Sequence, residues 1–237
     1  NGLLRAFVVV YGKEALQPNR QEPLLFSMLE KLNKIREGVT LRGGFTFSTS
    51  KAICRAFVRM LNVGWRTGHR LAEFVYHPSG EIYYLTRADV TWIIGGVTVT
   101  DPTTAQLAQL RPGDRVLISP PRSKTDQFGE IHSPFPSVVL FDFTRACNAG
   151  VCLRDIELEQ PCRGAERATT PLFADDAGHP FRHERMDDLL NAALLHVFGA
   201  GVMNTHSWHS LRSGLACALK AANCPPDEIQ LICRWLN

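Results

Sequence analysis

The stretch Asn204–Leu219, NTHSWHSLRSGLACAL, predicts a helix with two different faces. One face is an apolar stripe at helical spacing, formed by Leu211, Leu215, Ala218 and Leu219. His209 and Arg212 are three residues apart, so both project from a second face. A charged imidazole and a guanidinium both donate hydrogen bonds, and together they suit two oxygens of a phosphate. Taken alone, such a pair is more typical of a solvated helix face, so its meaning depends on the rest of the chain.

Apolar residues at helical spacing also predict helices on either side of the middle of the chain. We expect them within residues 22–35, 51–65, 182–199, 208–222 and 225–236. Between them, β-branched and aromatic residues bounded by Gly, Pro and Asp predict short strands within residues 81–85, 91–100, 115–119 and 137–141. The order of helices, small sheet and helices predicts an α+β fold that is mainly α.

The composition is that of an ordinary soluble globular protein. Of 237 residues, 45% are hydrophobic and 21% are charged, and the net charge of +3 permits nucleic acid as a partner without requiring it. The seven cysteines are scattered and form no CxxC pair, which favours buried, reduced thiols over a zinc site. No stretch approaches the length of a membrane span, so we expect no membrane association and an intracellular location.

A second candidate is the run RTGHRLAEF, residues 66–74. We expect Thr67 to cap a helix whose first turn holds Arg70, with Glu73 one turn later. An arginine at the start of a helix is poorly placed against the helix dipole. It therefore needs either Glu73 or an external anion as a partner, and an ordinary surface pair of Arg70 with Glu73 is the plainer interpretation.

Two further candidates are weak when taken singly. Lys124 lies in PPRSKTDQFGE, residues 120–130, a polar ribbon between two predicted strands, where a lysine is usually exposed and inert. Trp235 lies near the end of the last predicted helix, where an aromatic residue is usually core. Its indole N–H can still donate to an anion at the edge of a cleft.

In this order, TGxRxxE, a lysine in a β-ribbon, HxxR on a helix and a later tryptophan, the motifs resemble the catalytic domain of the tyrosine recombinase (phage integrase) family. The resemblance extends from about residue 21 to residue 237, and it is closest to the Cre-like members because HSLRSG is followed by the run EIQLICRW. Recombinases of eukaryotic retroelements and transposons share these features. The resemblance implies a helical catalytic domain with a small antiparallel sheet.

The resemblance also implies roles for individual residues. Arg70 and Arg212 would hold the non-bridging oxygens of a DNA phosphodiester and stabilise the charge of the transition state. His209 and Trp235 would donate further hydrogen bonds, and Lys124 would protonate the leaving 5′-oxygen. Glu73 would hold Arg70 or His209 in place. A tyrosine would then form a 3′-phosphotyrosine intermediate, with no metal or other cofactor.

The sequence departs from the family pattern at the nucleophile. The family's tyrosine lies a few residues after the tryptophan, whereas the tyrosines of this sequence are at positions 11, 76, 83 and 84. We therefore expect residues 21–237 to be a catalytic domain truncated before its nucleophile. Residues 1–20 are expected to be a linker or the tail of a missing N-terminal DNA-binding domain.

Double-stranded DNA is the expected partner, and the resemblance implies a homotetramer on DNA for the intact protein. Arg122, Arg182 and Arg185 are candidates for contacts to the DNA backbone. The expected location is the nucleus in a eukaryote and the cytoplasm in a bacterium or phage.

Two alternatives remain open at this point. The chain could be a catalytically disabled, DNA-binding relative with the same fold. Less readily, it could be a metal-dependent enzyme built on His206, His209 and the cysteines, although no third ligand stands at a partner spacing. Trp208, between the two histidines, is expected to pack in the core.

Overall fold

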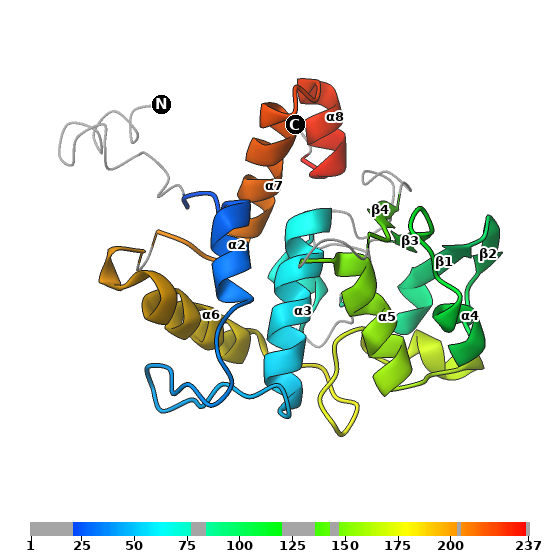
Figure 1. The fold of residues 1–237 in the computed structure, drawn as a ribbon, viewed down its shortest axis with the longest axis horizontal. Helices are drawn as coiled ribbons and strands as arrows, with labels where there is room; N and C mark the ends of the chain where they lie inside the picture. The colour runs from blue at the N-terminus through cyan, green and yellow to red at the C-terminus, as the bar shows by residue number, and fades with distance from the viewer. Residues whose placement is uncertain (1–20, 77–83, 120–135, 143–146, 203–204, 236–237) are drawn as a thin grey trace, which may run out of the picture.

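The computed structural model describes residues 21–76, 84–119, 136–142, 147–202 and 205–235. These residues form an α+β fold that is rich in helix and has a small antiparallel sheet to one side (Figure 1), as the sequence predicts. No helix in these ranges is both long and apolar enough to cross a membrane. The predicted linker, residues 1–20, lies outside the described residues.

Helix α3, Ala52–Thr67, is the central element of the fold. It packs against α5, Ala149–Glu159, on one side and against α7, His209–Ala221, on another, as Figure 1 shows. Most of its length is buried because small and apolar residues recur around the whole helix, among them Cys54, Phe57, Met60 and Leu61. The helix ends at Gly68, whose φ of 66° is the left-handed conformation that glycine adopts most easily.

Thr67 corrects one prediction. It is the last residue of α3 rather than the cap of a following helix, and its hydroxyl donates 2.7 Å to the Val63 carbonyl. The segment after Gly68 instead forms a 3-10 turn over Leu71–Glu73, with Arg70 at its N-terminal boundary. The sequence TG is compatible with both interpretations, because threonine caps helix starts and glycine terminates helices.

Four antiparallel strands are found among the described residues, in the order β2-β1-β3-β4. They are β1, Val90–Ile94, β2, Val97–Val99, β3, Arg115–Ile118, and β4, Ser137–Leu140. Trp92 pairs with Val99 on one side and with Val116 on the other, and Val116 pairs with Val139. Trp92, Val116 and Val139 are buried and Val99 is partly buried, while alternate residues such as Val138 and Leu140 are exposed.

Three of the four predicted strand regions are therefore confirmed. The fourth, residues 81–85, lies mostly outside the described residues, and neither Tyr84 nor Leu85 belongs to a strand. The Leu85 N–H instead donates to the Glu73 carbonyl and the Leu85 carbonyl accepts from the Leu172 N–H, which ties the segment after α3 to the segment after α5.

The remaining predicted helices are α2, Phe26–Leu32, α6, His183–Phe198, and α8, Pro226–Ile232, which are confirmed with shorter bounds for α2 and α8. The structure adds two helices that the sequence pattern did not reveal, α5 and the short α4, Thr104–Ala108. All seven cysteines are free, and Cys54, Cys162 and Cys233 are buried.

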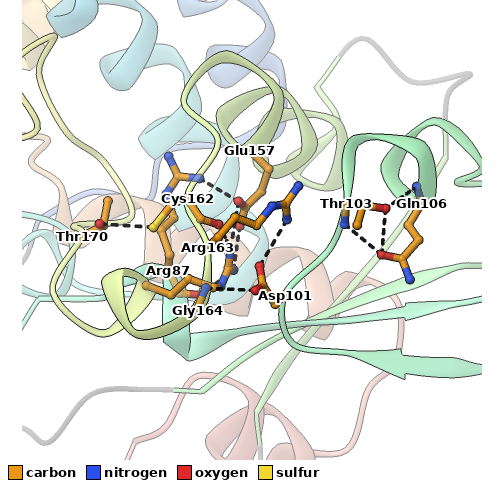
Figure 2. Close-up of polar contacts among 10 residues, drawn as sticks. Arg87, Asp101, Thr103, Gln106, Glu157, Cys162, Arg163, Gly164 and Thr170 are labelled. Carbon is orange, nitrogen blue, oxygen red and sulfur yellow. Dashed lines mark hydrogen bonds and ion pairs between the residues drawn. The ribbon is translucent and has the colours of Figure 1, made fainter.

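A buried ionic cluster lies beneath the sheet, away from the motifs singled out above (Figure 2). Glu157 on α5 lies 3.0 Å from Arg87 Nη1 and 2.8 Å from Arg167 Nη2, and all three side chains are almost fully inaccessible to solvent. Arg167 Nη2 also donates 2.8 Å to the Arg87 carbonyl. The cluster joins the segment before β1 to α5 and to the 3-10 helix Gly164–Ala168.

Helix α7 is held against the chain before α2 by a close backbone approach. Gly214 faces the Leu24 carbonyl so closely that a Cβ at this position would overlap it. Trp65 Nε1 donates 3.0 Å to the same carbonyl. A glycine two residues after Arg212 therefore lets α7 pack directly on the chain before α2, which fixes the orientation of Arg212.

Candidate anion-binding site

A cavity of about 330 Å³ lies where the segment after α3 meets the starts of α6 and α7. Arg70, His209 and Arg212 line it, together with His69, His183 and Asp187. Arg70 and Arg212 come from opposite halves of the sequence, yet they share this cavity. We call it the anion pocket.

Gly68 brings the two arginine-bearing segments together. A Cβ on Gly68 would lie 3.6 Å from Arg212 Cγ and 3.7 Å from Cys233 Cα, so the turn after α3 rests directly on α7 and on the end of α8. Gly68 turns the chain at the end of α3 with a positive φ. Arg70, two residues later in the TGHR run, then lines the pocket.

Arg70 is the more accessible of the two arginines. Its backbone N–H donates 2.8 Å to Glu73 Oε2, whereas its Nη1 stays 3.9 Å from Glu73 Oε1. The side chain is 44% exposed. A guanidinium this open and this loosely paired is available to an external anion.

Arg212 is buried, and its Nη2 donates to the carbonyls of Cys233 and, at 2.6 Å, Arg234. Its Nε is also buried and has no hydrogen-bond partner among the described residues. Burial, followed by the guanidinium groups of Arg70 and Arg234, lowers the pKa of Arg212 to about 10, so the side chain remains charged at neutral pH. Within the described ranges, no carboxylate lies at ion-pair distance from Arg212.

His209 is the first residue of α7 and is exposed at the pocket. Burial of the ring, and then the charges of Arg212 and Arg70, lower the pKa of His209 below its ordinary value. The imidazole lines the same pocket as both arginines. An anion in the pocket would oppose their effect and favour the protonated, hydrogen-bond-donating form.

Glu73 lies behind the pocket and holds a partner that the sequence did not indicate. Its Oε2 accepts 2.7 Å from Arg234 Nη2 and also accepts from the Arg70 backbone. Burial acts to raise the pKa of Glu73, but His69 and Arg234 outweigh that effect and the net shift is downward. Glu73 thus positions Arg70 through its backbone and makes no contact of the expected kind with His209.

Trp235 lies against the outer side of Arg212. The Arg212 Cζ is 6.0 Å from the centre of the indole ring, within cation–π range, and the ring is partly exposed. The structure therefore brings together Arg70, His209 and Arg212 in one pocket, with Glu73 and Trp235 at its back and side.

Other predicted site residues lie elsewhere or outside the described chain. Lys124 and Arg122 fall within residues 120–135, which the structure does not describe. Arg182 and Arg185 line a separate cavity of about 970 Å³ together with Tyr76 and Asp188. These two arginines are not part of the anion pocket.

His69 is a pocket residue that the sequence reasoning missed. The Thr67 hydroxyl gives its proton to the Val63 carbonyl, so at 2.7 Å from His69 Nδ1 the hydroxyl oxygen must accept. His69 therefore carries its proton on Nδ1, which leaves Nε2 as a buried acceptor without a partner among the described residues. Burial, and then Arg234, lower the pKa of His69 to about 3. The sequence feature that could have identified His69 as a pocket residue is its position next to Arg70.

His183 and Asp187 were also missed, because position 183 reads as an ordinary helix start. His183 Nδ1 lies 3.1 Å from Asp187 Oδ2, one turn apart on α6. Burial raises the pKa of Asp187, although the nearby His183 acts in the opposite direction. The pair adds an oriented imidazole to the wall of the pocket.

Trp208 packs in the core as predicted. It meets Phe57 edge-on at 5.9 Å and donates 3.2 Å to the Met186 carbonyl. His206 is buried, with Nδ1 2.8 Å from the Thr205 hydroxyl. Across the described ranges, no three His, Cys, Asp or Glu side chains are placed to share a metal ion, so the metal-site interpretation gains no support there.

Comparisons with known proteins give matches among solved structures alone. No family model matches the chain, and neither does any curated protein sequence. Among solved structures, the chain is similar to the Tn1549 transposon integrase in complex with a circular intermediate DNA. The TM-score is 0.48 at 10% sequence identity, and the match covers all of this chain and 68% of the integrase chain. At this level the likeness carries no functional conclusion. A functional conclusion therefore depends on the residues of the anion pocket.

Proposed function

We propose that this chain is the catalytic part of a site-specific DNA recombinase or integrase, which cuts and rejoins DNA through a 3′-phosphotyrosine intermediate. One observation carries the proposal: Arg70 and Arg212, distant in sequence, line one pocket together with His209. The order of these residues along the chain is that of the tyrosine recombinase motifs.

The charge balance of the pocket favours a phosphodiester. Arg212 is buried without a carboxylate partner in the described structure, and Arg70 is only loosely paired with Glu73. Excess buried positive charge is unfavourable unless an anion joins it. Guanidinium groups bind two phosphate oxygens in parallel, and their attraction strengthens as charge develops on those oxygens during attack.

The proposed reaction needs few groups. A tyrosine releases its phenolic proton to solvent as its oxygen attacks the phosphorus, the bond to the 5′-oxygen breaks, and Lys124 supplies the proton that the 5′-oxygen takes up. A 5′-hydroxyl then attacks the phosphotyrosine, which restores the phosphodiester and frees the tyrosine. Of the tyrosines that the structure describes, Tyr76 lines the other cavity and Tyr84 lies away from the pocket, so the nucleophile is assigned to neither.

The partner in this proposal is double-stranded DNA, bound by a homotetramer of the intact protein. Arg182, directly before α6, and Arg185, on α6, are proposed to contact the DNA backbone beside the pocket, as is Arg122. Contacts of this kind add affinity that falls with salt and does not depend on base sequence.

The test uses the intact protein and a nicked DNA substrate that traps the covalent adduct. A protein–DNA band that survives denaturing electrophoresis is expected from the wild type and is abolished by Arg212→Ala. Arg163→Ala is the matched control, because Arg163 is exposed and pairs with Asp101 far from the pocket. Salt-dependent DNA binding without an adduct would instead identify a disabled relative, and an adduct unaffected by Arg212→Ala would refute the assignment.

A further inference from the structure

Arg234 occupies a position at the end of α8 where glycine is usual. Its φ is 49°, in the left-handed region, and its N–H donates 3.0 Å to the Leu231 carbonyl. The next N–H, of Trp235, donates 2.8 Å to the Gln230 carbonyl. These two bonds define a Schellman motif with Arg234 at the residue after the C-cap. A side chain in that conformation is strained, so something else must favour it.

The side chain of Arg234 supplies that compensation. Its Nη2 lies 2.7 Å from Glu73 Oε2, and both side chains are largely buried. The carbonyl of the same residue accepts 2.6 Å from Arg212 Nη2. One strained residue therefore contacts Glu73 through its side chain and the pocket residue Arg212 through its backbone.

Arg234 also competes with Arg70 for the carboxylate of Glu73. Glu73 Oε2 is taken up by Arg234 and by the Arg70 backbone, while Arg70 Nη1 remains 3.9 Å from Glu73 Oε1. If Arg234 were absent, Glu73 would be free to pair closely with the Arg70 guanidinium. That pairing would neutralise the accessible cation of the pocket.

The same residue fixes the position of Trp235. The left-handed turn directs the chain back so that the indole ring lies 6.0 Å from Arg212 Cζ. Without the ion pair to Glu73, the Schellman turn would lose its anchor to the segment after α3. The Trp235 ring beside Arg212 would then be free to move.

We propose that Arg234 is a positioning residue of the anion pocket: it holds Glu73 away from the Arg70 guanidinium and holds Trp235 against Arg212. The inference rests on the proposed function, because it assumes that the pocket binds a phosphate-like anion. It adds a residue outside the recognised motifs, placed there by its backbone strain and its two contacts.

The test measures anion binding by the full chain, with inorganic sulfate and phosphate as probes. The ¹H–¹⁵N spectrum resolves one indole signal for each tryptophan, and Trp235→Phe identifies the signal of Trp235. In the wild type, sulfate is expected to shift that signal. Arg234→Gly relieves the backbone strain but removes the ion pair, and we expect sulfate affinity to fall about tenfold, as for loss of one charge-assisted hydrogen bond. The Trp235 signal should also sharpen towards that of a mobile indole.

Asn223→Gly is the matched control, because Asn223 is the other described non-glycine residue with positive φ, at 59°, and it makes no contact with the pocket. It should leave sulfate affinity unchanged, and Arg234→Lys should retain part of it. Wild-type affinity and an unchanged Trp235 signal in Arg234→Gly would overturn the role of Arg234 and leave the proposed function standing. An equal loss of sulfate affinity in Asn223→Gly would also overturn the role of Arg234. A wild type whose pocket signals ignore both anions would overturn the proposed function, and this inference with it.

Discussion

Replacing Glu157 by glutamine tests whether the buried ionic cluster holds the sheet to the helical part of the fold. Glu157 makes three contacts: Arg167 Nη2 at 2.8 Å, Arg167 Nη1 at 3.0 Å and Arg87 Nη1 at 3.0 Å. Glutamine has nearly the same shape, but only one of its two terminal atoms accepts hydrogen bonds. The other terminal atom would present an N–H to an arginine that itself has only donors.

The expected loss of stability is large because the cluster is inaccessible to solvent. The side chain of Glu157 is 2% exposed and that of Arg87 is inaccessible, so two guanidinium groups would be left without a counter-charge. Removing one partner of a buried ion pair destabilises a protein by about 3–5 kcal/mol. For a chain of this size each kcal/mol shifts Tm by roughly 2–4 °C, so a fall on the order of 10 °C is expected.

The assay is urea unfolding at neutral pH, followed by tryptophan fluorescence and circular dichroism. Glu159→Gln provides the control, since Glu159 lies on the same helix and pairs with Arg59, yet its side chain is 42% exposed. An exposed pair contributes about 1 kcal/mol or less. Equal losses in the two variants, or a loss below about 1 kcal/mol for Glu157→Gln, would refute the account of the cluster.

Three further outcomes are expected. Gly214→Ala forces a Cβ into the Leu24 carbonyl and should lower the free energy of unfolding by about 1–3 kcal/mol in urea titrations. His209 should titrate below its ordinary pKa in NMR spectra, and Arg212→Ala should raise that midpoint by removing a positive neighbour. His69, with a folded pKa of about 3 against 6.5 unfolded, stays neutral where the unfolded chain binds a proton. Stability should therefore fall by up to about 1.4 kcal/mol for each pH unit below that unfolded value.

Each of these outcomes has its own check. Gly201→Ala meets no atom within 4 Å of its new Cβ and should leave stability nearly unchanged, so a loss equal to that of Gly214→Ala would contradict the packing argument. An unmoved His209 midpoint in Arg212→Ala would mean that the two side chains do not interact. His69→Gln should flatten the acid side of the stability profile, and an unaltered slope would assign that slope to other groups.

The sequence predicted the parts of the fold that local periodicity controls. The apolar stripe on α7, the long helix α3 and the valine-rich strands each have a residue pattern that can be recognised without knowing what the element packs against. Helix α5 was missed because Gly150 and the charged residues along AGVCLRDIELE obscure its buried face. That face is defined by contact with α3 and β4, which no local pattern encodes.

The candidate site was predicted only as far as its motifs reached. Arg70, His209 and Arg212 were found from residue type and order, and the structure places them together. Arg234 and His69 were missed because their roles depend on backbone conformation and on hydrogen bonds to partners distant in sequence. Lys124 lies outside the described residues and stays a prediction.

The hydrogen bonds from Arg212 to the carbonyls at the end of α8 have a consequence for folding. The anion pocket is lined by the segment after α3, by the start of α6 and by the start of α7, and its buried Arg212 is held by the carbonyls at the end of α8. A folding intermediate that lacks any one of these segments has no complete pocket. The pocket can therefore bind an anion only in the complete tertiary structure, and sulfate or phosphate in the buffer should raise the melting temperature by binding the native state alone.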